Sequence, residues 1–328
     1  MPIAYRVVGN TIYASDYNRL QEKISSILGA GGGSYGFDYG YGQPLASSQV
    51  IGSTASNNNT GDLVTVKQMN DLRLDIMKCW HHQTMEPFPL STVATDDVVR
   101  SGPLTDAVLG QVNQSYNDFT FCVNQVDANR LSANPAAMSL IANKVEMSFS
   151  NWNNYKTHEI TVTFSDSNHR RYFFNAGGEI RITASHPGSY TLNTKSWVWQ
   201  TLLANAGMVR FNYDNNRAAV SSAPAILFYK SASGSSVVYA ENYYKVLVAS
   251  PADNVLLFRI IFHDVDVGDQ VGGSQPGPPV DENVTGTTKS TMSLYYPSGI
   301  VVDPEDNQAY NSVVLNQPLI TSLQGSVY

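Results

Sequence analysis

The stretch that decides the fold of the first part of the chain reads Ser15-Asp-Tyr-Asn-Arg-Leu-Gln-Glu-Lys-Ile-Ser-Ser-Ile-Leu28. Its apolar side chains recur every three or four residues, which is the period that places them on one face of an α-helix. Gly29 follows directly and is typical of the residue at which a helix ends. The pattern predicts an amphipathic helix from Ser15 or Asp16 to Leu28. Its apolar face consists of Tyr17, Leu20, Ile24, Ile27 and Leu28.

The same pattern returns further along the chain at a constant offset, so that Tyr17 corresponds to Met69. A second helix is therefore predicted over 66–82, and Thr65 with Gln68 forms a capping box at its start. We interpret the two copies, each a short strand, a cap and a helix, as an internal repeat. The second apolar face consists of Met69, Leu72, Ile76, Cys79 and Trp80.

Each of these short helices needs a partner to cover its apolar face. The two faces can cover each other, or they can pack on equivalent helices of other copies of the chain. We expect an interface between copies, in a homo-oligomer that is a trimer or higher. The helix residues expected at this interface are Tyr17, Leu20, Ile24, Met69, Leu72, Ile76 and Trp80.

The segment between the two helices is rich in glycine, serine, asparagine and tyrosine. Four aromatic residues in it, Tyr35, Phe37, Tyr39 and Tyr41, alternate with small or acidic residues, and an extended chain would place all four rings on one side. Such an arm could stack on sugars, dock on a neighbouring subunit or be low-complexity filler. We expect docking on a neighbour, because aromatic rings bury a large area at a low entropic cost.

From about Val145 the apolar period changes from helical to two, as in Ile160, Val162 and Phe164. Strands at this spacing, separated by turn signals, predict an antiparallel sandwich or barrel. One helix interrupts them, capped by Thr194 and ended by Gly207. The other predicted strands are Arg171–Asn175, Glu179–Ala184, Met208–Tyr213, Ala225–Lys230, Val237–Ala240, Tyr243–Ser250, Val255–His263 and Thr287–Tyr296.

The predicted fold class is α+β, with an N-terminal helical repeat region followed by one or two mainly antiparallel β-sandwich domains. Residues 1–83 form the helical anchoring region with its arm at 29–63. A mixed helical connector spans 84–144, and the segment 116–123 within it indicates a third helix. Residues 145–267 form the β-sandwich domain with one helix, and 268–328 hold a Gly/Pro linker, the final strand or strands and a tail.

Composition excludes several function classes. Charged residues make up 14% of the 328 residues and the net charge is −7, whereas a nucleic-acid-binding protein needs a basic face to neutralise phosphates. No apolar stretch is long enough to cross a bilayer, and the N-terminus lacks the pattern of a signal peptide. Two cysteines make neither a disulfide framework nor a zinc site. We expect no nucleic-acid partner and no membrane.

Enzyme motifs are absent from the sequence, and we expect no catalytic residues and no cofactor. Glu146, Glu159 and Glu179 fall on separate predicted strands, so nothing pairs two carboxylates as a glycosidase requires. Cys79 lies on a predicted apolar face and is interpreted as a small core residue.

Two sequence features suggest metal binding, and each has a simpler interpretation. His81-His82 ends the second helix, where the histidines compensate the helix dipole. The run Asp264-Val-Asp-Val-Gly-Asp269 is similar to an acidic calcium loop, but it lacks the bidentate glutamate and is interpreted as a solvated turn. No metal site is therefore predicted.

Several blocks carry a family likeness. Ala14-Ser-Asp-Tyr-Asn-Arg-Leu20 and the Gly-rich stretch ending Tyr41-Gly-Gln-Pro44 resemble the N-terminal part of virion structural proteins of large contractile-tailed bacteriophages, notably those of marine cyanobacteria. The second repeat copy and three later blocks are similar to the same family. The later blocks are Tyr172–Arg181, Trp199–Leu203 and Val280–Thr287. The resemblance implies a particle component of the neck, tail or a fibre attachment point, and it brings no catalytic residues.

The expected function is therefore structural. A subunit made in the host cytoplasm would enter the virion and assemble through its N-terminal helices and extended arms with copies of itself and with other virion proteins. The alternative is a receptor-binding or glycan-binding fibre module. It would use exposed aromatic side chains of the β domains beside Asp or Asn, such as Trp152, Trp197 or Tyr243.

Overall fold

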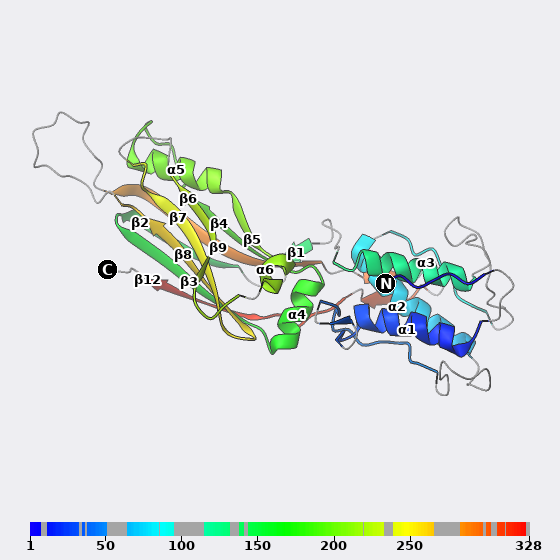
Figure 1. Cartoon of the computed structure of the whole chain (residues 1–328). Helices are drawn as coiled ribbons and strands as arrows, with labels where there is room; N and C mark the ends of the chain where they lie inside the picture. Colours follow the sequence, from blue (N-terminus) through cyan, green and yellow to red (C-terminus); the bar gives the residue numbers. More distant parts are fainter. Residues whose placement is uncertain are drawn as a thin grey trace, which may run out of the picture. The chain divides into compact units, whose positions relative to one another are not determined.

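A computed structural model contains both helices and antiparallel sheets, so the α+β fold class is confirmed. The structure describes residues 1–7, 12–32, 35–36, 38–50, 64–84, 86–94, 115–131, 138–140, 144–218, 220–232, 239–265, 283–297, 300–302, 307–311 and 313–325. The chain divides into two compact units, which we describe separately (Figure 1). The helical unit comprises Met1–Ser139, Arg171–Gly178 and Tyr296–Leu315. The sheet unit comprises Leu140–Arg170, Glu179–Tyr295 and Asn316–Tyr328.

Three helices form the core of the helical unit: α1 (Ala14–Leu28), α2 (Val66–Thr84) and α3 (Tyr116–Ala128). Each packs on the other two. The first two begin and end within two residues of the predicted bounds, and the segment 116–123 is helical as predicted. The apolar faces are thus covered by a triangle of helices within one chain. The unit also holds a two-stranded sheet of β10 (Ile300–Val302) and β11 (Ala309–Asn311).

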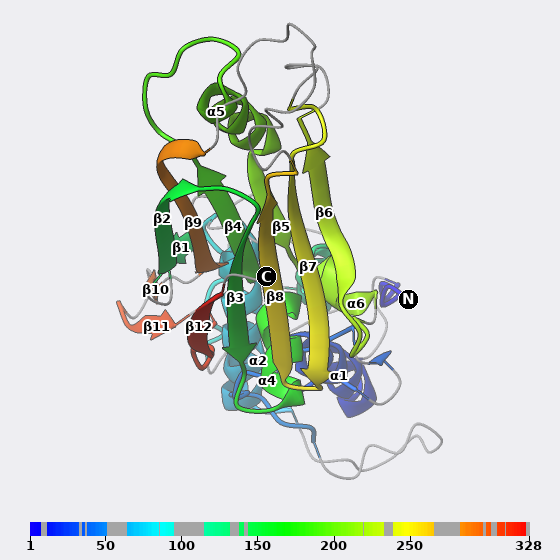
Figure 2. The ribbon, with the colours of Figure 1, turned by 90° about the vertical axis from the view of Figure 1, so that its left-hand side faces the viewer.

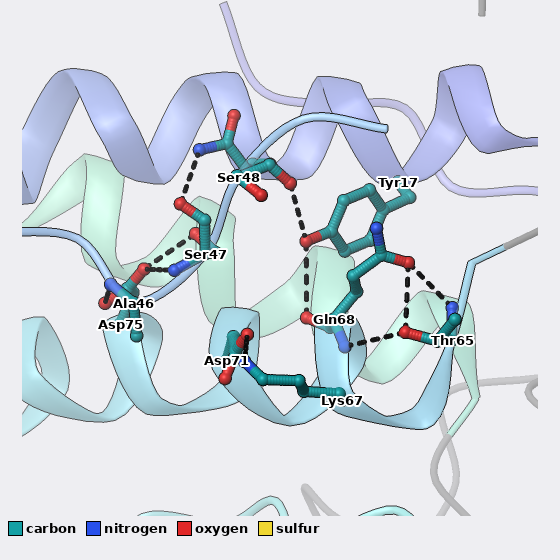
Figure 3. A network of polar contacts seen from close by, with 10 residues as sticks. Tyr17, Ala46, Ser47, Ser48, Thr65, Lys67, Gln68, Asp71 and Asp75 are labelled. Atoms are coloured by element: carbon teal, nitrogen blue, oxygen red, sulfur yellow. Dashed lines mark hydrogen bonds and ion pairs between the residues drawn. The ribbon is translucent and has the colours of Figure 1, made fainter. Parts of the chain in front are cut away.

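Local hydrogen bonds explain where two of these helices begin. At α2 the predicted capping box is present, with the Thr65 backbone N–H donating to Gln68 Oε1 at 2.8 Å and the Gln68 N–H donating to Thr65 Oγ1 at 3.3 Å (Figure 3). At α3 the Ser115 N–H donates to Asp118 Oδ2 at 2.7 Å, and the Asp118 N–H donates back to Ser115 Oγ at 3.2 Å. Each box satisfies backbone donors that the first helical turn leaves free.

Each helix also holds an extended segment through an amide side chain. Asn18 of α1 donates to the Val50 carbonyl at 3.0 Å and accepts from the Val50 N–H at 2.8 Å. Asn70 of α2 makes the same pair of bonds, at 3.0 and 2.8 Å, with Val93. Asn117 of α3 exchanges the equivalent pair with the backbone of Arg6. We call these extended segments the N-terminal strap (1–7), the first strap (38–50) and the second strap (86–94).

Asn18 and Asn70 are equivalent positions of the predicted repeat, and their neighbours continue the match. One turn further along each helix, Gln21 donates to Ser47 and Arg73 donates to Leu90, in each case to the backbone carbonyl three residues before the clamped valine. The internal repeat stays a prediction, which this correspondence of hydrogen bonds supports.

The first strap docks on its own chain. The prediction of a continuous extended arm is wrong. Gly36 and Gly40 adopt φ values of 74° and 102°, which lie in the left-handed region and turn the chain. The backbone N–H groups of Tyr41 and Gln43 then donate to the carbonyl oxygens of Ile27 and Leu28 at 2.8 and 2.9 Å. These bonds satisfy carbonyls at the C-terminal end of α1 that have no partner within the helix.

Further along, the first strap is fixed by a buried carboxylate of α2 (Figure 3). Asp75 accepts from the backbone N–H groups of Ala46 at 2.9 Å and Ser47 at 2.8 Å, and from the Ser47 hydroxyl at 2.6 Å. The Tyr17 hydroxyl lies 3.1 Å from the Ser48 carbonyl oxygen. A carboxylate with no exposed surface requires such donors, because its desolvation is costly.

The sheet unit is built on two antiparallel sheets. The first has the order β1-β9-β4-β5, with β2 also pairing with β9, and the second has the order β12-β3-β8-β7-β6 (Figure 2). The strands of the first are β1 (Met138–Leu140), β2 (Val145–Trp152), β4 (Glu179–Ser185), β5 (Met208–Phe211) and β9 (Val284–Pro297). Those of the second are β3 (Tyr155–Thr163), β6 (Ala225–Ser231), β7 (Tyr243–Ala252), β8 (Val255–His263) and β12 (Leu319–Gly325).

The two sheets pack face to face through alternate side chains. In β8, Leu256, Phe258, Ile260 and Phe262 are buried, whereas the residues that alternate with them are partly exposed. Phe258 meets Phe211 of β5 at a ring distance of 5.5 Å, and Phe262 meets Phe149 of β2 at 5.2 Å. Helix α5 (Lys195–Ala206) adds Trp199 to this core. The predicted helix and its cap at Thr194 are confirmed, because the Trp197 N–H donates to Thr194 Oγ1.

Two predicted strands are wrong. Residues 171–175 belong to helix α4 (Ser167–Asn175), although their aromatic side chains favour strands. Its start is fixed by Asp166, which accepts from the His169 N–H at 2.8 Å, and Gly177 follows its end with φ 84°. Of the predicted strand 237–240, residues 239–240 form a turn, and 237–238 lie outside the described residues. A short helix, α6 (Tyr213–Arg217), follows β5.

We predict that Asp75→Ala destabilises the chain by about 1–3 kcal/mol, because three donors of the first strap lose a buried acceptor. Urea denaturation measures the change in the free energy of unfolding. The matched control is Asp71→Ala on the same helix, which removes only the exposed pair with Lys67 and should cost at most about 1 kcal/mol. Equal losses in the two variants would contradict the role given to Asp75.

Candidate functional site

The side chains expected at a helix interface between copies lie in the core of the helical unit. Six of them are buried and Trp80 is half-buried, with its ring 6.0 Å from that of Phe88. The six are Tyr17, Leu20, Ile24, Met69, Leu72 and Ile76. In this conformation a second copy cannot reach them. Their role in an interface between copies stays a prediction that requires the helices to exchange partners.

The aromatic residues of the expected arm surround cations of the same unit. Lys23 Nζ lies 4.7 Å from the Tyr35 ring centre and 5.4 Å from that of Tyr39, and it pairs with Asp127 at 2.8 Å. The Tyr41 side chain is buried, and Gln83 donates to its hydroxyl oxygen at 2.9 Å. Phe37 lies outside the described residues. Docking of the arm on a neighbour therefore stays a prediction, whereas its docking on its own helices is observed.

Of the two adjacent histidines considered as metal ligands, His82 lies in the core of the helical unit. His82 is buried, its Nε2 lies 2.9 Å from the Ala176 carbonyl oxygen, and burial lowers its pKa to about 4. It is neutral at pH 7, so its interpretation as a positive charge at the helix end is wrong. Among the described residues, no group of three or more His, Cys, Asp or Glu side chains is arranged to hold a metal ion.

Asp264, the first residue of the calcium-like run, is not in a solvated turn. It is fully buried and pairs with Lys195 of α5, also fully buried, at 2.9 Å. The interpretation as an exposed turn is wrong for this residue, because its carboxylate neutralises a core lysine. Asp266 and Asp269 lie outside the described residues.

The other groups with reactive potential are engaged inside the units. Cys79 and Cys122 are buried, and burial raises the pKa of both thiols, so they stay protonated. The interpretation of Cys79 as a core residue is confirmed. The three glutamates pair with different cations: Glu146 with Lys144, Glu159 with Arg259 and Glu179 with Arg181.

A row of aromatic side chains crosses the outer face of the second sheet. The strand register places Tyr155 of β3 beside His263 of β8, and His263 beside Tyr243 of β7. The neighbours Tyr244 and Phe262 point inward and are fully buried, so Tyr243 and His263 lie on the opposite, outer face.

Ring contacts connect the row across four strands. Tyr155 stacks on His263 at 3.7 Å, Tyr243 meets the edge of His263 at 4.8 Å, and Tyr229 of β6 lies 5.4 Å from Tyr243. We call Tyr155, His263, Tyr243 and Tyr229 the aromatic row. Tyr229 is its most open member, with 51% of its surface exposed.

The environment of the row favours the neutral forms of Tyr243 and His263. Burial and the adjoining Tyr155 raise the pKa of Tyr243 to about 12. Burial and the Lys245 charge lower the pKa of His263, which favours its neutral form. Lys245 Nζ lies 5.1 Å from the Tyr243 ring centre. Flat apolar rings with tyrosine hydroxyls suit a ligand that has both an apolar face and polar groups.

The sequence named one member of this row and missed three. Tyr243 lies on the outer face, but Trp152 is 2% exposed and packs on Trp199 at 4.8 Å, so its expected exposure is wrong. Trp197 is half-buried on α5. The only sequence signal for the other members is that they occupy outward-facing positions in the alternating pattern of their strands, near the strand ends. It could not be used without the register that aligns the strands.

Two buried histidines lie between the sheets. His158 of β3 has its Nδ1 3.1 Å from Ser290 Oγ of β9, and His186 has its Nδ1 2.9 Å from Thr288 Oγ1. Trp152 Nε1 donates to the same Thr288 hydroxyl at 3.0 Å. Burial lowers the pKa of His158 to about 4 and lowers that of His186. These groups belong to the core and are neutral in the folded chain.

Comparison with protein-family models, curated proteins and solved structures finds no match to this chain. None of the helices in the described part combines the length and apolar character needed to cross a membrane.

We predict that acid destabilises the sheet unit through His158. Its folded pKa of about 4 lies below the unfolded value of about 6.5, so the unfolded chain binds the proton more tightly. The contribution of neutral His158 to the stability is fully present above the unfolded pKa of about 6.5, and it is lost as the pH falls from there through the folded pKa of about 4. Thermal melting between pH 7 and pH 4 should show a smaller decrease in Tm for His158→Gln than for the wild type. A decrease in Tm that is unchanged in His158→Gln would refute the assignment.

Proposed function

We propose that the chain is a structural subunit of a phage particle, at the neck, the tail or a fibre attachment point. The observation that carries the proposal is that buried ionisable side chains stabilise the interior of each unit. Lys23 pairs with Asp127, Asp75 holds the first strap, and Lys195 is neutralised in the sheet core. Such pairs fix a conformation, whereas a catalytic group needs access to a substrate.

The straps support the same proposal. The three helices each hold one extended segment through a pair of hydrogen bonds from an asparagine side chain. The result is a compact anchor built largely from uncharged side chains. With charged residues at 14% of the chain, its surface can enter many contacts while few ions lose their hydration. This property suits a subunit surrounded by neighbours, and it agrees with the family resemblance of the N-terminal blocks.

A second function is supported by the aromatic row. Uncharged rings on an open sheet face, with tyrosine hydroxyls and a nearby lysine, have the chemistry to bind a host-surface glycan. The stacking area and the hydroxyls would contact the apolar and polar sides of a sugar. A fibre-associated subunit could therefore combine attachment to the particle with recognition of a cell surface.

We predict that the protein is present in purified particles of the phage that encodes it, in a fixed ratio to the other virion proteins. Quantitative mass spectrometry of particles washed at high salt measures this ratio, and gold-labelled antibodies locate the protein on them. Labelling should be confined to the neck, the tail or the fibre attachment points. Loss of the protein on washing would contradict a structural role.

We predict that Tyr243→Ala weakens binding of the full chain to a positive oligosaccharide by about tenfold, because a stacking surface is lost. The probe is an array of bacterial surface oligosaccharides, followed by calorimetry of any positive. The control is Tyr5→Ala, which removes a tyrosine that is 47% exposed and lies in the helical unit, away from the row. No binding by the wild type, or equal losses in both variants, would exclude the row as a glycan site.

A further inference from the structure

The second sheet of the sheet unit has two edges, formed by β12 and β6. Among the described residues, no strand pairs with the outer side of either one. An edge strand presents backbone N–H and C=O groups that can pair with another chain, and monomeric proteins commonly block this with charges, bulges or very short strands.

The edge at β6 carries such protection. Its pairing with β7 is interrupted by a bulge between Ile226 and Phe228, and Lys230 is exposed near its end. The edges of the first sheet are protected as well. Strand β1 has only three residues, and β5 has four, one of which is Arg210. Strand β2 has a bulge between Ser150 and Trp152 and carries Glu146.

The edge at β12 has none of these features. Its sequence, Leu319-Ile-Thr-Ser-Leu-Gln-Gly325, contains neither a charged residue nor proline. Its register with β3 is uninterrupted from Leu319 opposite Thr163 to Gly325 opposite Thr157. Leu319 and Leu323 are 65% and 71% exposed. A regular, uncharged strand with exposed leucines is a surface suited to pairing with another strand.

The side chains of β12 also determine which partner fits. Thr321 lies opposite Thr161, and Thr161 points to the outer face because its neighbours Ile160 and Val162 are buried. Leu319 and Leu323 lie two residues on either side of Thr321 and share that face. The outer face of the strand thus reads leucine, threonine, leucine, which is symmetric about its centre.

We propose that β12 pairs antiparallel with β12 of a second copy of this chain, about a two-fold axis at Thr321. Leu319 of each copy then lies opposite Leu323 of the other copy, and the two Thr321 residues lie opposite each other. The two five-stranded sheets join into one sheet of ten strands. The proposal does not depend on the function proposed above, and it defines an interface between copies that leaves the helix triangle intact.

Other registers fit less well. If the register between the two strands shifted by one residue, the outward-facing side chains of one copy would lie beside the inward-facing side chains of the other. A slip by two residues would place leucines opposite threonine or glycine, and the leucine pairs would be lost. In this one register, an identical strand supplies two leucine pairs and introduces no unpaired charge. Such cross-strand apolar pairs stabilise adjacent strands.

Sedimentation equilibrium of the full chain tests the proposal. The wild type should be a dimer, and Thr321→Lys should weaken the association at least about tenfold, because two like charges would lie directly opposite each other. The control is Ile226→Lys on the β6 edge, where the side chain is 65% exposed, and this variant should remain dimeric. A wild-type monomer, or a dimer that survives Thr321→Lys, overturns the proposal.

A second variant does not depend on loss of association. Under mild oxidation Thr321→Cys should form a disulfide-linked dimer, whereas the native Cys79 and Cys122 are buried and should not cross-link. The matched control is Ile226→Cys, which should stay uncross-linked. Cross-linking of the control as readily as of Thr321→Cys, or of neither variant, overturns the assignment of the interface to β12. Circular dichroism verifies that each variant retains the wild-type fold.

Discussion

The pairing of backbone groups by side-chain amides and carboxylates is the interaction on which the helical unit depends. A strap has no neighbouring strand, so its N–H and C=O groups need other partners before they can be buried. Asn18, Asn70 and Asn117 each supply a donor and an acceptor to one strap residue. Asp75 accepts three hydrogen bonds from two residues of the first strap, Ala46 and Ser47. With these bonds made, three short helices and three extended segments form one core.

The sheet unit solves the same problem differently. Its strands satisfy each other, and the alternation of side chains then decides what lies inside and outside. The inner faces collect phenylalanine, isoleucine and the two buried histidines, and the outer face of the second sheet receives the aromatic row. Only at the edges do backbone groups stay open, which is why the difference between β6 and β12 matters for assembly.

These two solutions bear on function in opposite ways. In the helical unit the apolar faces and the ionisable side chains are used internally, so an interface between intact copies needs other surfaces. In the sheet unit the outer face and the edge at β12 offer such surfaces, with little charge to desolvate. The part of the chain that we expected to assemble is thus largely self-contained, and the part that we expected to face outward offers contacts to partners.

The sequence by itself determined the elements whose signals are local. The period of apolar residues located α1 and α2, and the Thr65–Gln68 box fixed a helix start. Alternation identified β3, β6, β7 and β8 of the second sheet, whereas β12 lies in the segment that was expected to be a tail. Tertiary structure alone decided the course of the first strap and the alignment of the aromatic row. It also set the burial of Trp152 and Asp264, and α4 formed where aromatic residues favour a strand. The physical reason is that a period or a cap acts within one turn or one strand. A buried charge, a strand register or a docked strap depends on partners many residues away, which the local sequence does not specify.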